Sequence, residues 1–129
     1  MIFFASDMKG GYGGTDIYVS IQVKENYWTD PINLGPVINT PGNESYPFYH
    51  PDGFLYFSSD YHTGFGGYDL FMAKQKDGDW VSVTNLKQPF NSTYDDFGIF
   101  FNEDKSFGFF SSNRPGGKGK EDIYLVRKK

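Results

Sequence analysis

Short apolar runs, separated by turn residues, follow one another along the chain. They are most regular in the middle of the sequence, at residues 45–50, 54–59, 69–74 and 80–84. Pro51-Asp52-Gly53 divides the first two runs and Asp77-Gly78 the last two, and both are typical of tight turns because Gly and Asp tolerate positive φ. The pattern predicts four β-strands joined by turns and loops.

Two of these runs are apolar at consecutive positions. Residues 54–57 read Phe-Leu-Tyr-Phe, and residues 70–72 read Leu-Phe-Met. The side chains of a strand alternate between the two faces of its sheet, so these strands are apolar on both faces. We expect them in sheets that are covered on both sides by neighbouring sheets.

The same pattern is present three times. The segments ASDMKGGYGGTDIYV, SSDYHTGFGGYDLFM and SSNRPGGKGKEDIYL begin at Ala5, Ser58 and Ser111, so they repeat every 53 residues. Between them, six residues recur at an offset of 52: Trp28, Asn33, Leu34, Asn39, Phe48 and Asp52 as Trp80, Asn85, Leu86, Asn91, Phe100 and Asp104. A unit of four antiparallel strands with a period near 50 residues is typical of a β-propeller blade.

We therefore predict an all-β fold, a partial β-propeller of about three blades made of four-stranded antiparallel sheets. Residues 1–43 would form a first blade without its first strand, residues 44–95 a complete second blade, and residues 96–129 a third blade without its last strand, ten strands in all. Closed propellers have roughly 4–8 blades. We expect an apolar face at each end of the array, covered by further blades of a longer parent chain or by other copies that close a ring.

Composition supports this fold and narrows the partners. The chain has 16 Gly, 7 Pro, 14 Phe, 10 Tyr and 2 Trp, which favour turns and strands over helices. Its net charge of −4 argues against nucleic acid and anionic membranes as partners. Without Cys, neither a disulfide framework nor a thiolate metal site is predicted. No apolar run approaches the ~20 residues of a membrane span, and residues 1–5 are too short for the apolar region of a signal peptide.

Five short motifs stand at different places along the repeat: Asn33-Leu34-Gly35, Pro51-Asp52-Gly53, Ser58-Ser59-Asp60, Asp69-Leu70-Phe71 and Arg114-Pro115-Gly116-Gly117. With them the whole chain resembles the WD-like β-propeller repeat related to the TolB propeller. Such tandem repeats accompany OmpA-like peptidoglycan-binding domains in cell-envelope proteins of the Bacteroidetes type. The resemblance implies a protein-binding or scaffold module in the periplasm or at the outer membrane.

The Gly-rich loop of each repeat carries recurring polar residues, for which we predict a structural role: Ser6, Asp16, Ser59, Asp60, Asp69, Ser112 and Asp122. Its glycines would supply positive φ, and the repeated Asp would accept hydrogen bonds from loop N–H groups. A calcium-binding nonapeptide does not fit, because the Asp lies one residue too late and the segment recurs every 53 residues instead of every nine. Carboxylates near residues 43–44 and 95–96 leave a calcium site built from other oxygens as an open alternative.

Residues that differ between the repeats are the candidates for binding, because repetition specifies the scaffold. Tyr12, Phe65 and Lys118 occupy the middle of the three loops. The two rings could contact a partner protein or a sugar, or they could pack on the adjacent blade. Ser59, Asp60 and His62 lie too close in sequence for a catalytic triad, and we expect His62 to be an exposed loop residue.

The sequence thus favours a non-catalytic module for protein–protein contact, with partners that include neighbouring blades of the same or another chain. Neither a cofactor nor a metal is predicted. Carbohydrate or peptidoglycan-fragment binding through the loop aromatics is the alternative. An enzyme, for example a glycosidase with two carboxylates about 5–10 Å apart, is a third hypothesis.

Overall fold

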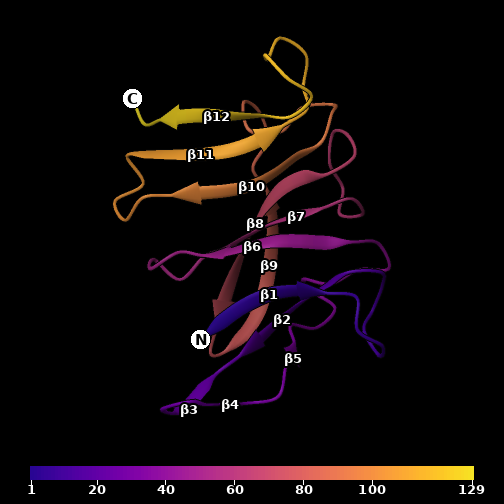
Figure 1. Ribbon diagram of the computed structural model, residues 1–129, viewed down its shortest axis with the longest axis vertical. Coiled ribbons are helices and arrows are strands. Elements are labelled where there is room, and N and C mark those ends of the chain that lie inside the picture. The colour runs from indigo at the N-terminus through magenta and orange to yellow at the C-terminus, as the bar shows by residue number, and fades with distance from the viewer.

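The computed structural model describes residues 1–129, which form twelve β-strands and no helix. Ten of the strands build three antiparallel sheets, the blades of a partial β-propeller, which are stacked from bottom to top in Figure 1. None of the segments is a helix long and apolar enough to span a membrane. The predicted all-β fold is therefore confirmed.

The strands of each blade follow one another along the chain, except that two short strands interrupt the first blade. The first blade has β1 (Ile2–Ser6), β2 (Asp16–Ser20) and β5 (Ile32–Asn33). The second has β6 (Glu44–Tyr49), β7 (Leu55–Ser59), β8 (Asp69–Lys76) and β9 (Asp79–Asn85). The third has β10 (Asp96–Phe101), β11 (Phe107–Ser112) and β12 (Asp122–Arg127), and β3 (Gln22–Lys24) pairs with β4 (Tyr27–Trp28) in a separate hairpin.

The long loops and the short turns lie at opposite ends of the sheets. The Gly-rich loops, which enter β2, β8 and β12, lie at the right in Figure 1, and the short turns and both chain ends lie at the left. In the turn between β8 and β9, Asp77 and Gly78 have φ values of 53° and 84°, as a tight hairpin requires. We call the two sides the loop end and the turn end.

Two strands of the first blade are interrupted where the second blade has the continuous β8 and β9, one as β2 and β3 and the outer one as β4 and β5, which is why there are twelve strands instead of ten. Trp28 belongs to the separate hairpin, and only β5 continues the sheet. In the second blade, Val83 of β9 pairs with Ala73. The equivalent of Val83 is Pro31, which has no N–H to donate to a ladder. The proline therefore separates the outer strand of the first blade into two short pieces.

Adjacent blades are joined by two apolar cores. The first joint, between the first and second blades, is built around six buried side chains: Ile17, Ile38, Leu55, Phe57, Phe71 and Ala73. The second joint, between the second and third blades, is built around Tyr56, Leu70, Ile99 and Phe110. Leu55 and Tyr56 are neighbours in β7 and face different joints, so the second blade is apolar on both faces, as its sequence predicts.

Two buried asparagines bind the linkers between blades to neighbouring strands through hydrogen bonds. Asn39 accepts a hydrogen bond from Ile17 N–H (2.8 Å) and donates one to the Ile17 carbonyl (2.9 Å). Asn91 makes the same pair of bonds with Leu70, at 2.6 and 2.9 Å. The amide groups thus pair with the edge of β2 or β8 as a neighbouring backbone would. Each bond contributes roughly 1 kcal/mol and fixes the linker that leads into the next blade.

The innermost strands β6 and β10 share an irregular register. The irregularity spans Ser45 to Phe48 in β6 and the equivalent residues of β10. At its centre, Tyr46 has φ 53° and the equivalent Gly98 has φ 65°. Glycine adopts this left-handed conformation without strain, whereas a tyrosine in it costs roughly 1 kcal/mol or more. The bulge is thus part of the repeat, and the second blade holds an aromatic residue there at a conformational cost.

Candidate functional site: the loop face

The repeated Asp that follows each Gly-rich loop accepts hydrogen bonds from the loop backbone. Asp16 Oδ2 accepts a hydrogen bond from Tyr12 N–H (2.5 Å), and Asp69 Oδ2 accepts one from Phe65 N–H (2.6 Å). In the third blade, Asp122 Oδ1 accepts from Gly119 N–H (3.2 Å). These are the bonds that the sequence predicts for the repeated Asp. They fix the backbone directly beneath the loop tip.

Asp69 is almost completely removed from solvent, with 1% of its surface exposed. Burial raises its pKa, while hydrogen bonds from the N–H groups of Gly66 and Phe65 oppose the increase. Its Oδ1 has no hydrogen-bond partner, and the same is true of Oδ1 of Asp16. Each of these carboxylates therefore holds its loop through one oxygen only.

The reason for the loop glycines differs from the prediction. Among them only Gly10 and Gly116 have positive φ. At Gly64, a Cβ would lie within 1.8 Å of Asp69 Oδ2, and at Gly66 it would lie 2.4 Å from the Thr93 carbonyl oxygen. The glycines are thus needed mainly because the loop backbone passes very close to the Asp below it and to the linker beside it.

The repeated serines also have structural contacts. Ser6 Oγ accepts a hydrogen bond from Met8 N–H (3.1 Å), and Ser59 Oγ accepts from Tyr61 N–H (3.1 Å). Ser112 Oγ accepts from Arg114 N–H (3.1 Å). Each serine thus fixes the first turn of the loop that follows its strand.

Asp60 connects its loop to the linker before the second blade. Its Oδ1 accepts a hydrogen bond from Asn43 N–H (2.7 Å), and its Oδ2 accepts one from Asn43 Nδ2 (2.9 Å). Both oxygens of this exposed carboxylate are therefore used to hold the linker, and the position of the residue is structural.

Two fully buried carboxylates lie at the loop end of the sheets. Glu44 accepts hydrogen bonds from Thr40 N–H (2.7 Å), Thr40 Oγ1 (2.7 Å) and Ser59 Oγ (2.6 Å). Asp96 accepts from Ser112 Oγ (2.6 Å) and from the guanidinium of Arg114 (2.8 Å). Both are 0% exposed. These are two of the carboxylates that the sequence offered as calcium ligands, and in the structure their oxygens hold linker and strand together.

Two residues that follow the repeated serines, His62 and Arg114, contact backbone carbonyls across the joints. His62 is half-buried, not exposed as predicted, because its ring packs on Phe57 and Phe71. Its Nε2 lies 2.8 Å from the Ile38 carbonyl oxygen, across the first joint. It is thus held by its contacts within the joint.

Arg114 has the corresponding place in the second joint. It donates hydrogen bonds to the carbonyls of Pro89 and Phe90, and its guanidinium lies 5.0 Å from the centre of the Phe110 ring. Aligning the repeats places Arg114 opposite Tyr61, one residue before His62. The alignment therefore does not show that Arg114 and His62 both contact backbone carbonyl oxygens across a joint.

The three predicted binding residues lie on separate loops, one on each blade. Tyr12 is 50% exposed, Phe65 is 49% exposed, and Lys118 is exposed. About half of the surface of Tyr12 and of Phe65 is therefore available to solvent. Because Asp16 and Asp69 bind the N–H groups of Tyr12 and Phe65 themselves, the backbone that carries each ring is fixed.

Further exposed rings at the loop end were not identified from the sequence. Tyr61 is 60% exposed, Tyr46 50% and Tyr94 46%. Tyr46 and Tyr94 stand where the other copies have Gly98 and Gly42, a difference between repeats that could have indicated them. Together with Tyr12 and Phe65, these three residues define what we call the loop face.

A half-buried tyrosine, Tyr68, lies near acidic side chains at the loop end. Burial and the neighbouring Asp60 carboxylate raise the pKa of Tyr68, with smaller contributions from Tyr46 and Asp95. Its phenol is therefore protonated at neutral pH and can donate a hydrogen bond.

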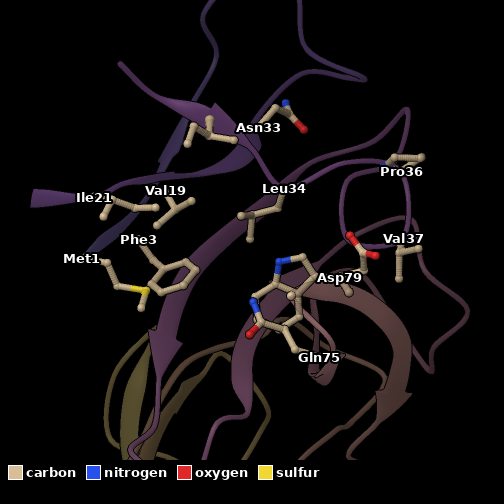
Figure 2. Close-up of a pocket in the computed structure, with 13 residues that line it drawn as sticks. Met1, Phe3, Val19, Ile21, Asn33, Leu34, Pro36, Val37, Gln75 and Asp79 are labelled. Carbon is tan, nitrogen blue, oxygen red and sulfur yellow. The ribbon is translucent and has the colours of Figure 1, made fainter. Parts of the chain in front are cut away.

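A separate groove of about 630 Å³ lies between the first and second blades, away from the predicted residues. Figure 2 shows Phe3, Val19 and Leu34 on one side and Gln75 and Asp79 on the other. The groove is mostly apolar, and none of Tyr12, Phe65 or Lys118 lines it.

No three His, Asp or Glu side chains gather in an arrangement that could hold a metal ion. The comparisons with known proteins add no family. No protein-family model matches the chain, and no curated protein matches it.

Proposed function

We propose that the chain is a non-catalytic β-propeller module that binds a partner protein through the loop face. Support comes from a difference between the repeated residues, which make structural contacts, and the variable residues, which are exposed. The repeated Asp, Ser and Asn side chains are used to hold strands, loops and linkers together. The variable positions at the loop end carry half-exposed aromatic rings on fixed backbone.

Rigid, half-exposed Tyr and Phe side chains are suited to protein recognition. Aromatic side chains provide a large contact area and lose little conformational entropy on binding, and they are enriched where interfaces have their largest energies. A loop backbone that is already ordered lowers the entropic cost further. The resemblance to envelope-associated propeller repeats is the basis for proposing a bacterial cell-envelope scaffold, in the periplasm or at the outer membrane.

Selection from a displayed library of random peptides tests this proposal. Peptides enriched on the wild-type chain should bind the double variant Tyr12→Ala/Phe65→Ala at least about tenfold more weakly, because each lost ring removes roughly 1 kcal/mol or more. The matched control is Tyr27→Ala, a 59% exposed ring in β4, away from the loop face. Peptides that bind the double variant as well as the wild type would overturn the proposal.

A second candidate function is carbohydrate binding by the same loop rings. Half-exposed aromatic faces such as those of Tyr12 and Phe65 can stack on sugar rings. A glycan array that includes peptidoglycan fragments distinguishes the two hypotheses. Binding to the array that Tyr12→Ala or Phe65→Ala abolishes, together with an absence of selected peptides, would favour the carbohydrate.

A further inference from the structure

The outward face of the third blade is apolar and uncovered. Five large side chains point to this face, and their exposed fractions are 45% for Phe100, 38% for Phe107, 40% for Phe109, 74% for Ile123 and 47% for Leu125. Pairing places Phe100 opposite Phe109 and Phe109 opposite Leu125, so the residues form one continuous surface across β10, β11 and β12. We call it the open face.

The open face repeats a surface that already binds a sheet inside the molecule. Its residues correspond, one by one, to Phe48, Phe54, Tyr56, Leu70 and Met72 of the second blade. All five of those side chains pack in the second joint, where Tyr56 is 3% exposed and Leu70 is 0% exposed. The open face therefore has the apolar pattern of a surface whose partner is known from the structure: the next sheet of the same repeat.

The opposite side of each joint also has a recurring feature. A stacked aromatic pair lies there, Phe57 with Phe71 in the first joint and Phe110 with Tyr124 in the second, with ring centres 5.9 and 5.6 Å apart. The first blade has the same pair, Phe4 with Tyr18, at 5.9 Å.

This third pair lies on the side of the first blade that faces away from the second. Ile17 packs in the first joint, so its neighbour Tyr18 is on the other side of β2. Beside the pair, Ile2 is 51% exposed, whereas its equivalent Leu55 is 0% exposed in the first joint. The first blade thus presents the part of a joint's second half that corresponds to β11 and β12, without a counterpart of Ile99 in β10, and the open face presents the first half.

We propose that the open face binds the first blade of a second copy of this chain, head to tail, in the manner of the two internal joints. The contact is heterologous, because two different surfaces meet. Contact between two open faces is disfavoured, since each also carries Arg127, which pairs with Phe107, and the like charges would face each other. This surface is separate from the loop face, so the proposal does not depend on the proposed function.

Two charge substitutions, one on each half, test the proposal on the 129-residue chain. Ile123→Arg blocks the open face, and Ile2→Arg blocks the first blade. Both side chains are at least half exposed in the single chain, so the fold should tolerate the changes, which circular dichroism can check. The control is Val23→Arg, an equally apolar residue that is 65% exposed in the separate β3–β4 hairpin.

Sedimentation velocity over a wide concentration range gives the result. The wild type and Val23→Arg should associate as concentration increases. Each blocked variant should remain monomeric, with a dissociation constant raised at least about 100-fold, because an unpaired guanidinium would be buried. A mixture of Ile123→Arg and Ile2→Arg should form one-to-one dimers and nothing larger, because each variant retains the half that the other lacks.

Three results would overturn the proposal. A wild type that stays monomeric at every concentration shows that the halves do not bind each other. Association of Ile2→Arg by itself shows contact between two open faces. Association of the wild type that neither substitution weakens shows that another surface is responsible.

Discussion

The two joints of the molecule occupy the same place in the repeat, yet different chemistry closes them. The first joint has six buried apolar side chains, and at its loop end His62 Nε2 lies 2.8 Å from the Ile38 carbonyl oxygen. The second has four, and Arg114 adds bonds to two carbonyls and to the buried Asp96 carboxylate. The first joint therefore depends on apolar packing, and the second depends in addition on charge.

The turn end of the second joint has polar contacts as well. His50 is buried, and its Nε2 lies 2.9 Å from the Asn102 carbonyl oxygen in the third blade. Beside it, Asp52 forms an ion pair with Lys105. The comparison teaches that the repeat specifies which faces meet, while variable residues at the two ends determine which polar contacts hold each joint.

The largest expected effect tests the apolar part of the comparison. Phe57→Ala should lower the free energy of unfolding by about 3–5 kcal/mol, because Phe57 is fully buried in the first joint and its removal leaves a cavity. Phe4 has the same repeat position but is only half-buried on the outward side of the first blade, so Phe4→Ala should cost about 1–2 kcal/mol. Urea denaturation measures both changes, and equal losses would show that the outward side is as well packed as the joint.

The second prediction concerns the charged contact. Arg114→Met should cost about 2–3 kcal/mol, because the 0% exposed Asp96 would lose its cationic partner. His62→Ala should cost about 1–2 kcal/mol, since it removes one hydrogen bond and some packing. In a double-mutant cycle, Arg114→Met combined with Asp96→Asn should cost less than the sum of the single changes. Additive costs would mean that the guanidinium does not stabilise the joint through Asp96.

Glycines at one repeat position provide the third prediction. An Ala Cβ at Gly66 would lie 2.4 Å from the Thr93 carbonyl oxygen, whereas at the equivalent Gly119 its nearest neighbours would be 3.8 Å away. Gly66→Ala should therefore destabilise the chain by about 1–3 kcal/mol. Gly119→Ala should change stability by less than about 0.5 kcal/mol. A neutral Gly66→Ala, measured by thermal and urea unfolding, would contradict the close approach of loop and linker.

The repeat made the fold predictable, because a constant spacing reveals turns, strands and blade limits at once. Strands β6 to β9 differ from their predicted bounds by no more than two residues at either end. The break in the outer strand of the first blade was missed although Pro31 gives a local signal for it. Comparing Pro31 with Val83 would have shown that one ladder position had lost its N–H.

The site was harder to predict, because its contacts join segments that are distant in sequence. The sequence left Glu44 open as a metal ligand. It could not reveal the bonds from Thr40 and Ser59 that bury this carboxylate, because they depend on how linker and strand meet. The partnership of His62 with a carbonyl 24 residues earlier leaves no local pattern. Tyr46 could have been found, because a copy with Gly98 at the same position indicates a left-handed backbone.

The smallest expected effect concerns the pair of Asp52 and Lys105 at the turn end of the second joint. Burial tends to raise the pKa of Asp52, but hydrogen bonds from Lys105, Phe54 N–H and His50 together lower it below the usual 3.8. Burial likewise tends to lower the pKa of Lys105, but its contacts with Asp52 and Tyr56 raise it above the usual 10.5. Each group therefore favours its charged form in the folded chain.

The sign of the pH dependence follows from these directions. The contribution of Asp52 is present above pH 3.8 and is lost as the pH falls through its lower folded pKa. The contribution of Lys105 is present below pH 10.5 and is lost as the pH rises through its higher folded pKa. Lys105→Met should therefore cost about 0–1 kcal/mol at neutral pH, because both side chains are about one-third exposed, and should flatten the stability profile at both extremes. Lys74→Met, an exposed lysine in β8, is the control. A Lys105→Met profile that falls as steeply as the wild type below pH 3.8 would show that the ion pair does not lower the pKa of Asp52.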